Sequence, residues 1–289
     1  MPKTLPDAAV TVIIPSFNRA KTLERALNSV INQTRPAVQI IVIDDGSTDG
    51  TQALVKEKFP QVDYIYQPNQ GVSAARNTGI RLAAQQQGHH DWIALLDSDD
   101  EWLPEKLEHQ LAAWQQQPHY RLIHSEEIWI RNGRRVNAMK KHRKQGGHIF
   151  RHCLPLCAIS PSAVLLQRSL LEEVGLFDES LPACEDYDLW LRICHREAVL
   201  FLDEPLIIKY GGHEDQLSRQ YWGMDRFRIQ ALHNCIENES LNQADRQAAI
   251  TMLLYKLDIL AKGAAKRNQY NAVAQYEHLK ASYSKDSYT

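Results

Sequence analysis

The sequence predicts an α/β fold: a mostly parallel sheet flanked by helices, followed by a helical C-terminal extension. Over the first hundred residues, short and continuously apolar runs alternate with segments of helical apolar spacing. Continuous apolar strands that alternate with helices are typical of a parallel sheet covered on both faces. After about residue 221 the chain has no Pro and only two Gly, Gly223 and Gly263, which favours long helices.

The expected elements follow in chain order. Four strands open the chain, at Val10–Ile14, Ile40–Ile43, Val62–Tyr66 and Trp92–Leu96. Each leads into a helix, at Lys21–Asn32, Asp49–Lys58, Val72–Gln87 and Pro104–Gln115. Further extended segments are expected at Ile149–Phe150, Ala163–Gln167 and Ala198–Ile208, and a helix at Asp186–Glu197. The long helices are expected at Gly223–Glu237, Gln243–Ala265 and Gln269–Ser282.

Composition excludes several classes of protein. The 289 residues are 44% apolar and 24% charged, ordinary for a globular protein and unlike disordered, collagenous or coiled-coil chains. The longest apolar run has five residues, whereas a membrane-spanning helix needs about 20. The N-terminus lacks an apolar signal core, and an odd count of five Cys argues for reduced thiols. We therefore expect a cytoplasmic protein.

Charge is distributed unevenly along the chain. The net charge is −2, yet no Asp or Glu occurs between Ile128 and Leu171. Nine basic residues lie there: Arg131, Arg134, Arg135, Lys140, Lys141, Arg143, Lys144, Arg151 and Arg168. One basic segment in an otherwise acidic chain does not indicate nucleic-acid binding. Two interpretations stay open: a surface that faces an anionic acceptor or membrane, or a plain solvated loop.

Polar residues follow the predicted strands, at the edge where open α/β sheets bind ligands. Asp97 and Asp99 stand two apart at a strand end, so their carboxylates converge and suit Mg²⁺ or Mn²⁺. The alternative is a turn cap with solvated acids. Asp44 and Asp45 can accept hydrogen bonds from a ribose or base, or can form an Asx-type turn. Arg76 can reach a nucleotide from its helix, or can be an ordinary surface Arg.

Two further sites are indicated near the end of this region. Glu185 and Asp186 open a predicted helix, and Asp186 shares a face with the apolar Trp190, which suits a general base. A helix N-terminus also favours the ionised carboxylate, although a simple cap is the alternative. His213 follows Gly211 and Gly212, where it can contact a diphosphate or a metal, or have neither role.

Taken together, these segments resemble the inverting glycosyltransferases of family 2, which have the GT-A fold. The resemblance covers roughly residues 9–215 and rests on five segments in order. They are Val10-Thr11-Val12-Ile13-Ile14-Pro15-Ser16-Phe17-Asn18-Arg19, Val42-Ile43-Asp44-Asp45-Gly46-Ser47-Thr48-Asp49-Gly50-Thr51, Asn69-Gln70-Gly71-Val72-Ser73-Ala74-Ala75-Arg76-Asn77, Leu95-Leu96-Asp97-Ser98-Asp99-Asp100 and Glu185-Asp186-Tyr187-Asp188-Leu189-Trp190-Leu191-Arg192.

The resemblance implies a reaction and assigns roles to the residues. A sugar would pass from a nucleoside diphosphate, most simply a UDP-sugar, to a hydroxyl of a saccharide or lipid-linked acceptor, in surface polysaccharide synthesis. Asp186 resembles the catalytic base, with Glu185 beside it. Mn²⁺ or Mg²⁺ would bind to Asp97, Asp99 and His213. The donor-binding set would be Pro15, Ser16, Asn18, Arg19, Asp44, Asp45, Arg76, Asp97 and Ser98.

The resemblance and the expected elements together predict that the chain has two regions. Residues 1–220 would form the catalytic domain, with a nucleotide-sugar half at 1–100 and an acceptor half at 101–220. Residues 221–289 would form the helical extension, which packs on the catalytic domain or makes a homodimer contact. Residues 131–151 would touch the inner face of a membrane. A non-catalytic module that binds nucleotide sugars or glycans is the alternative function.

Overall fold

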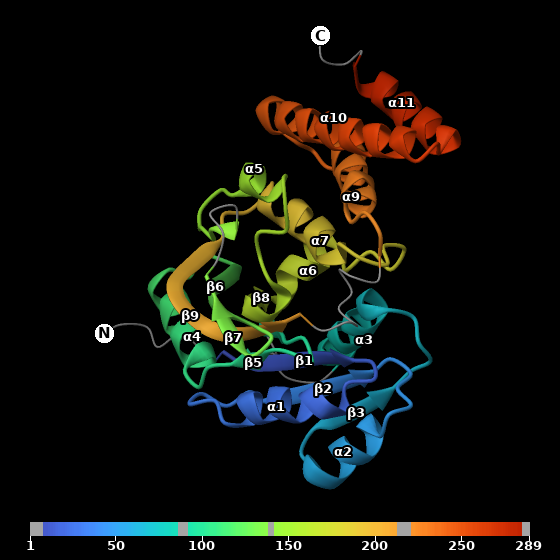
Figure 1. Ribbon diagram of the computed structural model, residues 1–289. Coiled ribbons are helices and arrows are strands. Elements are labelled where there is room, and N and C mark those ends of the chain that lie inside the picture. The colour runs from blue at the N-terminus through green and yellow to red at the C-terminus, as the bar shows by residue number, and fades with distance from the viewer. Residues whose placement is uncertain (1–7, 86–91, 138–141, 213–220, 285–289) are drawn as a thin grey trace.

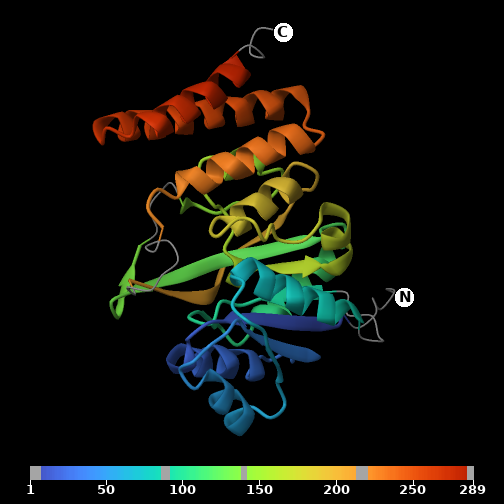
Figure 2. The same ribbon diagram turned by 90° about the vertical axis from the view of Figure 1, so that its right-hand side faces the viewer.

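The computed structural model describes residues 8–85, 92–137, 142–212 and 221–284 of the chain. Figure 1 shows that the N-terminal strands and the last two helices lie at opposite ends of the molecule, and Figure 2 shows the same order from the side. The sheet and its flanking helices occupy the region between these ends. The expected α/β architecture with a helical extension is confirmed.

The N-terminal half is the parallel sheet that the sequence predicts. Its elements are β1 (Val10–Ser16), α1 (Ala20–Ile31), β2 (Gln39–Asp44), α2 (Thr51–Lys58), β3 (Asp63–Tyr66), α3 (Val72–Gln85) and β4 (Trp92–Leu95). β2 pairs in parallel with β1 and β3, and β1 also pairs in parallel with β4. Ser16 lies opposite Asp44, so the polar residues that end these strands share one edge of the sheet.

The second half makes the sheet mixed. It contains β5 (Glu101–Trp102), α4 (Lys106–Gln116), β6 (Leu122–Arg131), β7 (Arg134–Val136), α5 (Phe150–Cys153), β8 (Leu165–Gln167), α6 (Arg168–Val174), α7 (Glu185–Cys194) and β9 (Leu200–Gly211). The strand order is β3-β2-β1-β4-β8-β6-β9-β5, with β7 paired to β6. β8 runs antiparallel to both β4 and β6, while β6 and β9 are parallel.

Several features of this half differ from expectation, and β5 and α6 were not predicted. The hairpin β6–β7 was not predicted, because β6 carries Glu126 and Glu127 in its middle and its pairing with β9 shifts register there. Its turn is Asn132-Gly133, both with positive φ. The extended segment expected at Ile149–Phe150 is wrong: Phe150 begins α5. A two-residue apolar run fits either a strand or a buried helix, so periodicity does not decide.

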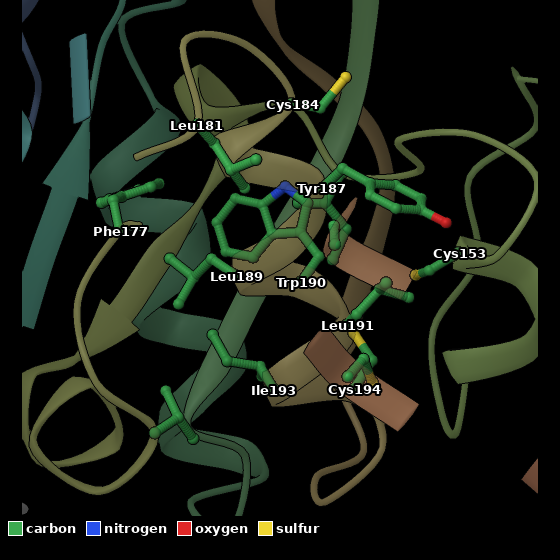
Figure 3. Close-up of a cluster of buried hydrophobic side chains, with 14 of the residues drawn as sticks. Cys153, Phe177, Leu181, Cys184, Tyr187, Leu189, Trp190, Leu191, Ile193 and Cys194 are labelled. Atoms are coloured by element: carbon green, nitrogen blue, oxygen red, sulfur yellow. The ribbon is translucent and has the colours of Figure 1, made fainter. Parts of the chain in front are cut away.

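Hydrophobic side chains pack on both faces of the sheet. One cluster gathers around α1 and α4, and a larger one around α3 and α7. Figure 3 shows the residues of α7 in the larger cluster, where Tyr187, Leu189, Trp190 and Leu191 are fully or almost fully buried. A helix that is buried on all sides is a core element. α7 is therefore held firmly, and so is the acidic pair at its start.

The C-terminal helices continue this core outward. They are α9 (Asp225–Asn238), α10 (Gln243–Lys266) and α11 (Tyr270–Ser284). Apolar residues of α9 and α10 belong to the same cluster as α7. Lys256 of α10 donates to the carbonyl of Pro155 and to Asp225, at 2.9 Å each. The division of the chain at residue 220 stays a prediction, since the two regions share packing.

Within the described ranges, no helix combines the length and the apolar character that a membrane span requires.

A close approach of α3 to β1 depends on Gly79. A Cβ atom at this position would lie 2.5 Å from Cγ2 of Ile13, in the middle of the sheet. The same helix carries Arg76 three residues earlier. The missing side chain of Gly79 therefore sets how near Arg76 comes to the edge of the sheet.

Replacing Gly79 with Ala should lower the free energy of unfolding by about 1–3 kcal/mol, the usual cost of overpacking a core. The matched control is Gly263→Ala in α10, where the nearest atom is Nη2 of Arg267 at 3.3 Å and that flexible side chain can move. Gly263→Ala should stabilise the protein by up to about 1 kcal/mol through helix propensity. Chemical denaturation measures both, and a neutral Gly79→Ala would contradict the packing argument.

Candidate functional site

The loops after β1 and β2 are joined by hydrogen bonds. Asn18, whose φ is 52°, accepts at Oδ1 from the backbone N–H of Thr48 at 2.8 Å. Its own N–H donates to Oγ of Ser47 at 2.8 Å. The Oγ of Ser16 is buried and has no hydrogen-bond partner among the described residues. These contacts fix Asn18 and leave the Ser16 hydroxyl available to a bound molecule.

Both acids after β2 are buried and hydrogen-bonded. Asp44 accepts from the N–H of Ser47 at 2.8 Å and from the hydroxyl of Tyr64 at 2.5 Å. Asp45 accepts from the side chain of Gln67 and from backbone N–H groups at the start of α3. Asp45 thus joins β2 to α3. Asp44 accepts from the N–H three residues further on and not two, so this contact is not an Asx turn, and each carboxylate keeps further acceptor capacity for a ligand.

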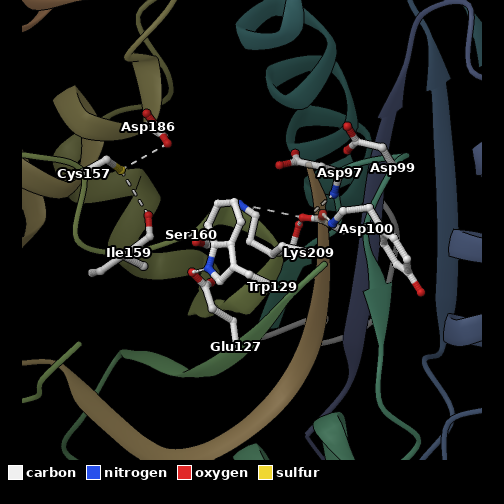
Figure 4. A network of polar contacts seen from close by, with 12 residues as sticks. Asp97, Asp99, Asp100, Glu127, Trp129, Cys157, Ile159, Ser160, Asp186 and Lys209 are labelled. Atoms are coloured by element: carbon white, nitrogen blue, oxygen red, sulfur yellow. Dashed lines mark hydrogen bonds and ion pairs between the residues drawn. The ribbon is translucent and has the colours of Figure 1, made fainter. Parts of the chain in front are cut away.

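Three acids cluster after β4, as Figure 4 shows. Asp100 is buried, accepts from Oγ of Ser162 at 2.6 Å, and burial and the charges of Asp97 and Asp99 raise its pKa to about 8. Burial and the charge of Asp97 also raise the pKa of Asp99. Burial by itself would raise the pKa of Asp97, but the charges of Arg76 and Lys209 hold it below its ordinary value. Asp97 and Asp99 therefore lie close enough to interact electrostatically.

Arg76 connects the acid cluster to the start of α7. Its Nη2 lies 2.7 Å from Asp97 and its Nη1 lies 2.5 Å from Glu185. The side chain is only 4% exposed, and its guanidinium lies 5.2 Å from the ring centroid of Phe177. The sequence suggested that Arg76 reaches a nucleotide. The structure commits both terminal nitrogens to carboxylates that come from distant parts of the chain.

The two acids at the start of α7 have different surroundings. Glu185 is buried against Arg76, and burial and the charge of Asp186 raise its pKa to about 7. Asp186 is partly exposed, unlike the fully inward position expected from its apolar helix face. Its Oδ1 accepts from the N–H of Tyr187 at 2.7 Å. The exposed carboxylate is therefore Asp186, the residue that the sequence suggested as a base.

A cysteine thiol adjoins Asp186. Sγ of Cys157 lies 3.1 Å from Oδ2 of Asp186 and 3.2 Å from the carbonyl oxygen of Ile159 (Figure 4). A thiol has one proton, so it donates to one of these acceptors at a time. Burial and the charge of Asp186 raise the pKa of Cys157, which keeps the thiol protonated. The sequence gave no signal for this contact, since 29 residues separate the two.

The residues that the sequence predicts as metal ligands fit a cation only in part. Asp97 and Asp99 offer the hard oxygen ligands that Mg²⁺ and Mn²⁺ prefer. Among the residues that the structure describes, however, no group of three or more His, Cys, Asp or Glu stands ready to hold a metal. His213, the third expected ligand, lies outside the described residues. Two carboxylates suit an ion that also takes water and substrate oxygens as ligands.

The basic segment is not one continuous cationic surface. Lys144 pairs with Glu127 at 3.2 Å, Arg151 with Asp245 at 2.7 Å, and Arg168 with Glu172. Another group lies on the β6–β7 hairpin, which is exposed from Arg131 onward. Lys140 and Lys141 lie outside the described residues. The segment has no acids of its own, and acids from elsewhere in the fold neutralise part of its charge.

Two functional candidates were missed by the sequence analysis. Phe17 lies between Ser16 and Asn18 and is 47% exposed, which is unusual for a large apolar side chain beside a polar strand end. Lys209 lies near the end of β9 and faces the acid cluster. The sequence feature that could have indicated Lys209 is its position directly after the apolar run Leu206-Ile207-Ile208.

Comparison with known proteins identifies relatives of this chain. The family model described as Glycosyl transferase family 2 matches residues 11–175. An Escherichia coli protein named UDP-Glc:alpha-D-GlcNAc-diphosphoundecaprenol beta-1,3-glucosyltransferase WfgD is 32% identical, over 65% of this chain and 70% of that protein. An uncharacterized glycosyltransferase of Rickettsia bellii is 32% identical over 66% of this chain. The chain spans 27% of that protein's length and 33% of a Rickettsia conorii relative.

Solved structures share the fold. Residues 1–349 of S. aureus TarS, in complex with UDP-GlcNAc, match with a TM-score of 0.71 and 21% identity, over 93% of this chain and 80% of that one. The mannosyltransferase PcManGT of Pyrobaculum calidifontis, in complex with GDP-Man and Mn2+, matches with a TM-score of 0.55 and 18% identity, over 98% and 88%. At these identities the likeness concerns the fold, and the expected GT-A fold is confirmed.

Replacing Glu185 with Gln should flatten the pH dependence of stability. The folded protein holds a proton on Glu185 up to about pH 7, whereas the unfolded chain releases it near pH 4.5. The stabilisation from this proton is complete below about pH 4.5 and is lost as the pH rises to 7. Between these limits the wild type should lose on the order of 2 kcal/mol more of its unfolding free energy than the variant does.

Chemical denaturation at a series of pH values measures this difference. The control is Glu172→Gln, which removes an exposed glutamate of α6. A difference between wild type and Glu185→Gln that stays constant over this pH range would contradict the prediction.

Proposed function

The chain belongs to glycosyl transferase family 2, and from this premise we propose that it transfers a sugar from a nucleoside diphosphate to an acceptor hydroxyl, with inversion at the anomeric carbon. One observation carries the proposal. Arg76 joins the acid cluster after β4 to the acidic pair that opens α7, through Asp97 and Glu185. A donor-binding edge and a candidate base thus face one site.

The nucleoside end of the donor is proposed to bind at the ends of β1 and β2. The hydroxyl of Ser16 and the remaining acceptor capacity of Asp44 and Asp45 can receive or donate hydrogen bonds there. The exposed ring of Phe17 offers a face on which a base can stack. Pro15, Asn18, Arg19 and Ser98 complete the proposed donor set. A UDP-sugar donor is supported by the names of WfgD and of the TarS complex.

Asp97 and Asp99 are the proposed ligands of Mn²⁺ or Mg²⁺, together with His213. When bound, such an ion would stabilise the negative charge that gathers on the departing nucleoside diphosphate. The Mn2+ in the PcManGT complex supports a divalent ion in a protein of this fold. The buried pair of Arg76 and Asp97 holds one of the two carboxylates in place.

Asp186 is the proposed general base. The acceptor hydroxyl gives its proton to Asp186 as its oxygen attacks the anomeric carbon, and the bond from that carbon to the phosphate oxygen breaks. A single displacement of this kind inverts the anomeric centre. The N–H of Tyr187 and the thiol of Cys157 hold the carboxylate in position. Glu185, buried against Arg76, is a positioning residue in this scheme.

The acceptor is proposed to be a saccharide or a lipid-linked saccharide used to build a surface polysaccharide. The name of WfgD, which specifies a diphosphoundecaprenol acceptor, supports this class. The exposed hairpin residues Arg131, Arg134 and Arg135 suit contact with anionic headgroups at the inner face of a membrane, in a cytoplasmic protein. Dimerisation through the C-terminal helices stays a prediction.

Replacing Asp186 with Asn should reduce sugar transfer by about 10²–10⁴-fold, the range that a general base contributes. Binding of UDP should stay near that of the wild type, because the side chain touches the acceptor and not the nucleotide. Sugar transfer is measured with a panel of nucleotide sugars and with a GlcNAc-diphosphoundecaprenol acceptor, as named for WfgD. Binding of UDP is measured by calorimetry. Asp203→Asn on the exposed part of β9 is the control. Wild-type turnover by Asp186→Asn would overturn the base assignment.

Replacing Asp99 with Ala should abolish the gain in UDP affinity that Mn²⁺ brings, since one of two carboxylate ligands is lost. Affinity for uridine, which has no phosphate, should not change. Calorimetry with Mn²⁺ and with EDTA measures the gain, and Asp203→Ala is the control. If Asp99→Ala kept the full effect of Mn²⁺, the proposed metal site would be wrong.

A further inference from the structure

Lys209 places a positive charge beside the acid cluster from an element not used so far. It lies near the end of β9, opposite Trp129 on β6, and its side chain is 18% exposed. The ammonium lies 5.2 Å from the ring centroid of Trp129 and 3.9 Å from Oδ2 of Asp100. Figure 4 shows it between Trp129 and the acid cluster, with Asp186 on the far side.

The surroundings of Lys209 keep it charged. Burial by itself would lower the pKa of its ammonium, but the carboxylates of Asp100, Glu127, Asp97 and Asp99 raise that pKa above its usual range. Neutralising these acids is one function of the ammonium. That function does not explain why Nζ of Lys209 lies at 3.9 Å from Oδ2 of Asp100, which is beyond hydrogen-bond distance.

The ammonium makes no hydrogen bond with any described residue. The three lysines that are buried in the described structure all do. Lys106 donates to Gln110 at 2.8 Å, Lys256 to Asp225 at 2.9 Å, and Lys144 to the carbonyl of Ala158 at 3.4 Å. An ammonium has three donors, and the partly exposed side chain of Lys209 leaves those of its ammonium open to a ligand. Lys209 is therefore arranged for a partner that is not part of the described protein.

Arg76, the other cation of the site, does not offer the same opportunity. Its two terminal nitrogens already bind Asp97 and Glu185. Its Nε is buried and has no hydrogen-bond partner in the described structure. The terminal nitrogens of Arg76 are therefore occupied and its Nε is covered, so a ligand with negative charge at the acid cluster meets accessible unused donors at Lys209.

We propose that Lys209 binds the diphosphate of the donor and stabilises the nucleoside diphosphate as it leaves. This inference rests on the proposed function. When the bond from the anomeric carbon to the phosphate oxygen breaks, its electron pair stays on that oxygen, and the ammonium donates hydrogen bonds to the phosphate oxygens. A cation held among carboxylates also balances the charge that a diphosphate adds to an acidic site.

The test compares two ligands in each variant. Uridine and UDP share the nucleoside, so the ratio of their affinities isolates the contribution of the diphosphate. Calorimetry is run in EDTA and in Mn²⁺ on the wild type, Lys209→Gln, Lys209→Arg and the control Lys256→Gln, which removes a buried lysine remote from the acid cluster. Because the ratio is taken within one variant, a partly unfolded sample does not alter it.

We expect Lys209→Gln to lower the ratio of UDP affinity to uridine affinity by about tenfold or more. Lys209→Arg should keep most of the ratio because it keeps the charge, and Lys256→Gln should keep all of it. If Lys209→Gln kept the wild-type ratio of UDP affinity to uridine affinity, the inference would be overturned. Lys209 would then serve only to neutralise the neighbouring carboxylates. If the wild type binds no UDP in either condition, the proposed function with a UDP-sugar donor itself fails, which is a separate result.

Discussion

The site depends on one contact, the bridge that Arg76 makes between Asp97 and Glu185. Breaking this bridge would leave the buried charge of Arg76 unpaired, which is far costlier than losing an exposed ion pair. The bridge joins the end of β4 to the start of α7, segments that are about ninety residues apart in the sequence. It holds the proposed donor-binding edge of the sheet and the candidate base at a fixed separation, which a reaction between two positioned substrates would require.

The rest of the fold supports this bridge. Gly79 lets α3 lie close against β1, which sets the height of Arg76 above the sheet. Asp45 anchors the start of α3 through the N–H groups of Gln70 and Gly71. On the other side, the buried helix α7 holds Glu185 against Arg76 and leaves Asp186 partly exposed. The neighbouring acids Glu185 and Asp186 thus receive different environments.

The fold also determines which acidic and basic side chains are paired with one another. Lys144, Arg151 and Arg168 belong to a segment without acids, yet each is paired with an acid from outside that segment. Lys209 shows the reverse case, since it is surrounded by acids and hydrogen-bonded to none of the described residues. A linear count of charge does not separate these cases, because pairing depends on which strands and helices lie side by side.

Local sequence patterns were enough to predict the parallel half of the sheet, the long C-terminal helices and the order of the polar segments at the strand ends. These features follow from local periodicity and from the rule that parallel strands present their carboxyl ends at one edge. The contacts of Arg76 with Asp97 and Glu185, the contact of Cys157 with Asp186 and the hairpin of β6 and β7 are visible only in the folded chain. These contacts join residues far apart in the chain or break a simple pattern, so no local signal specifies them.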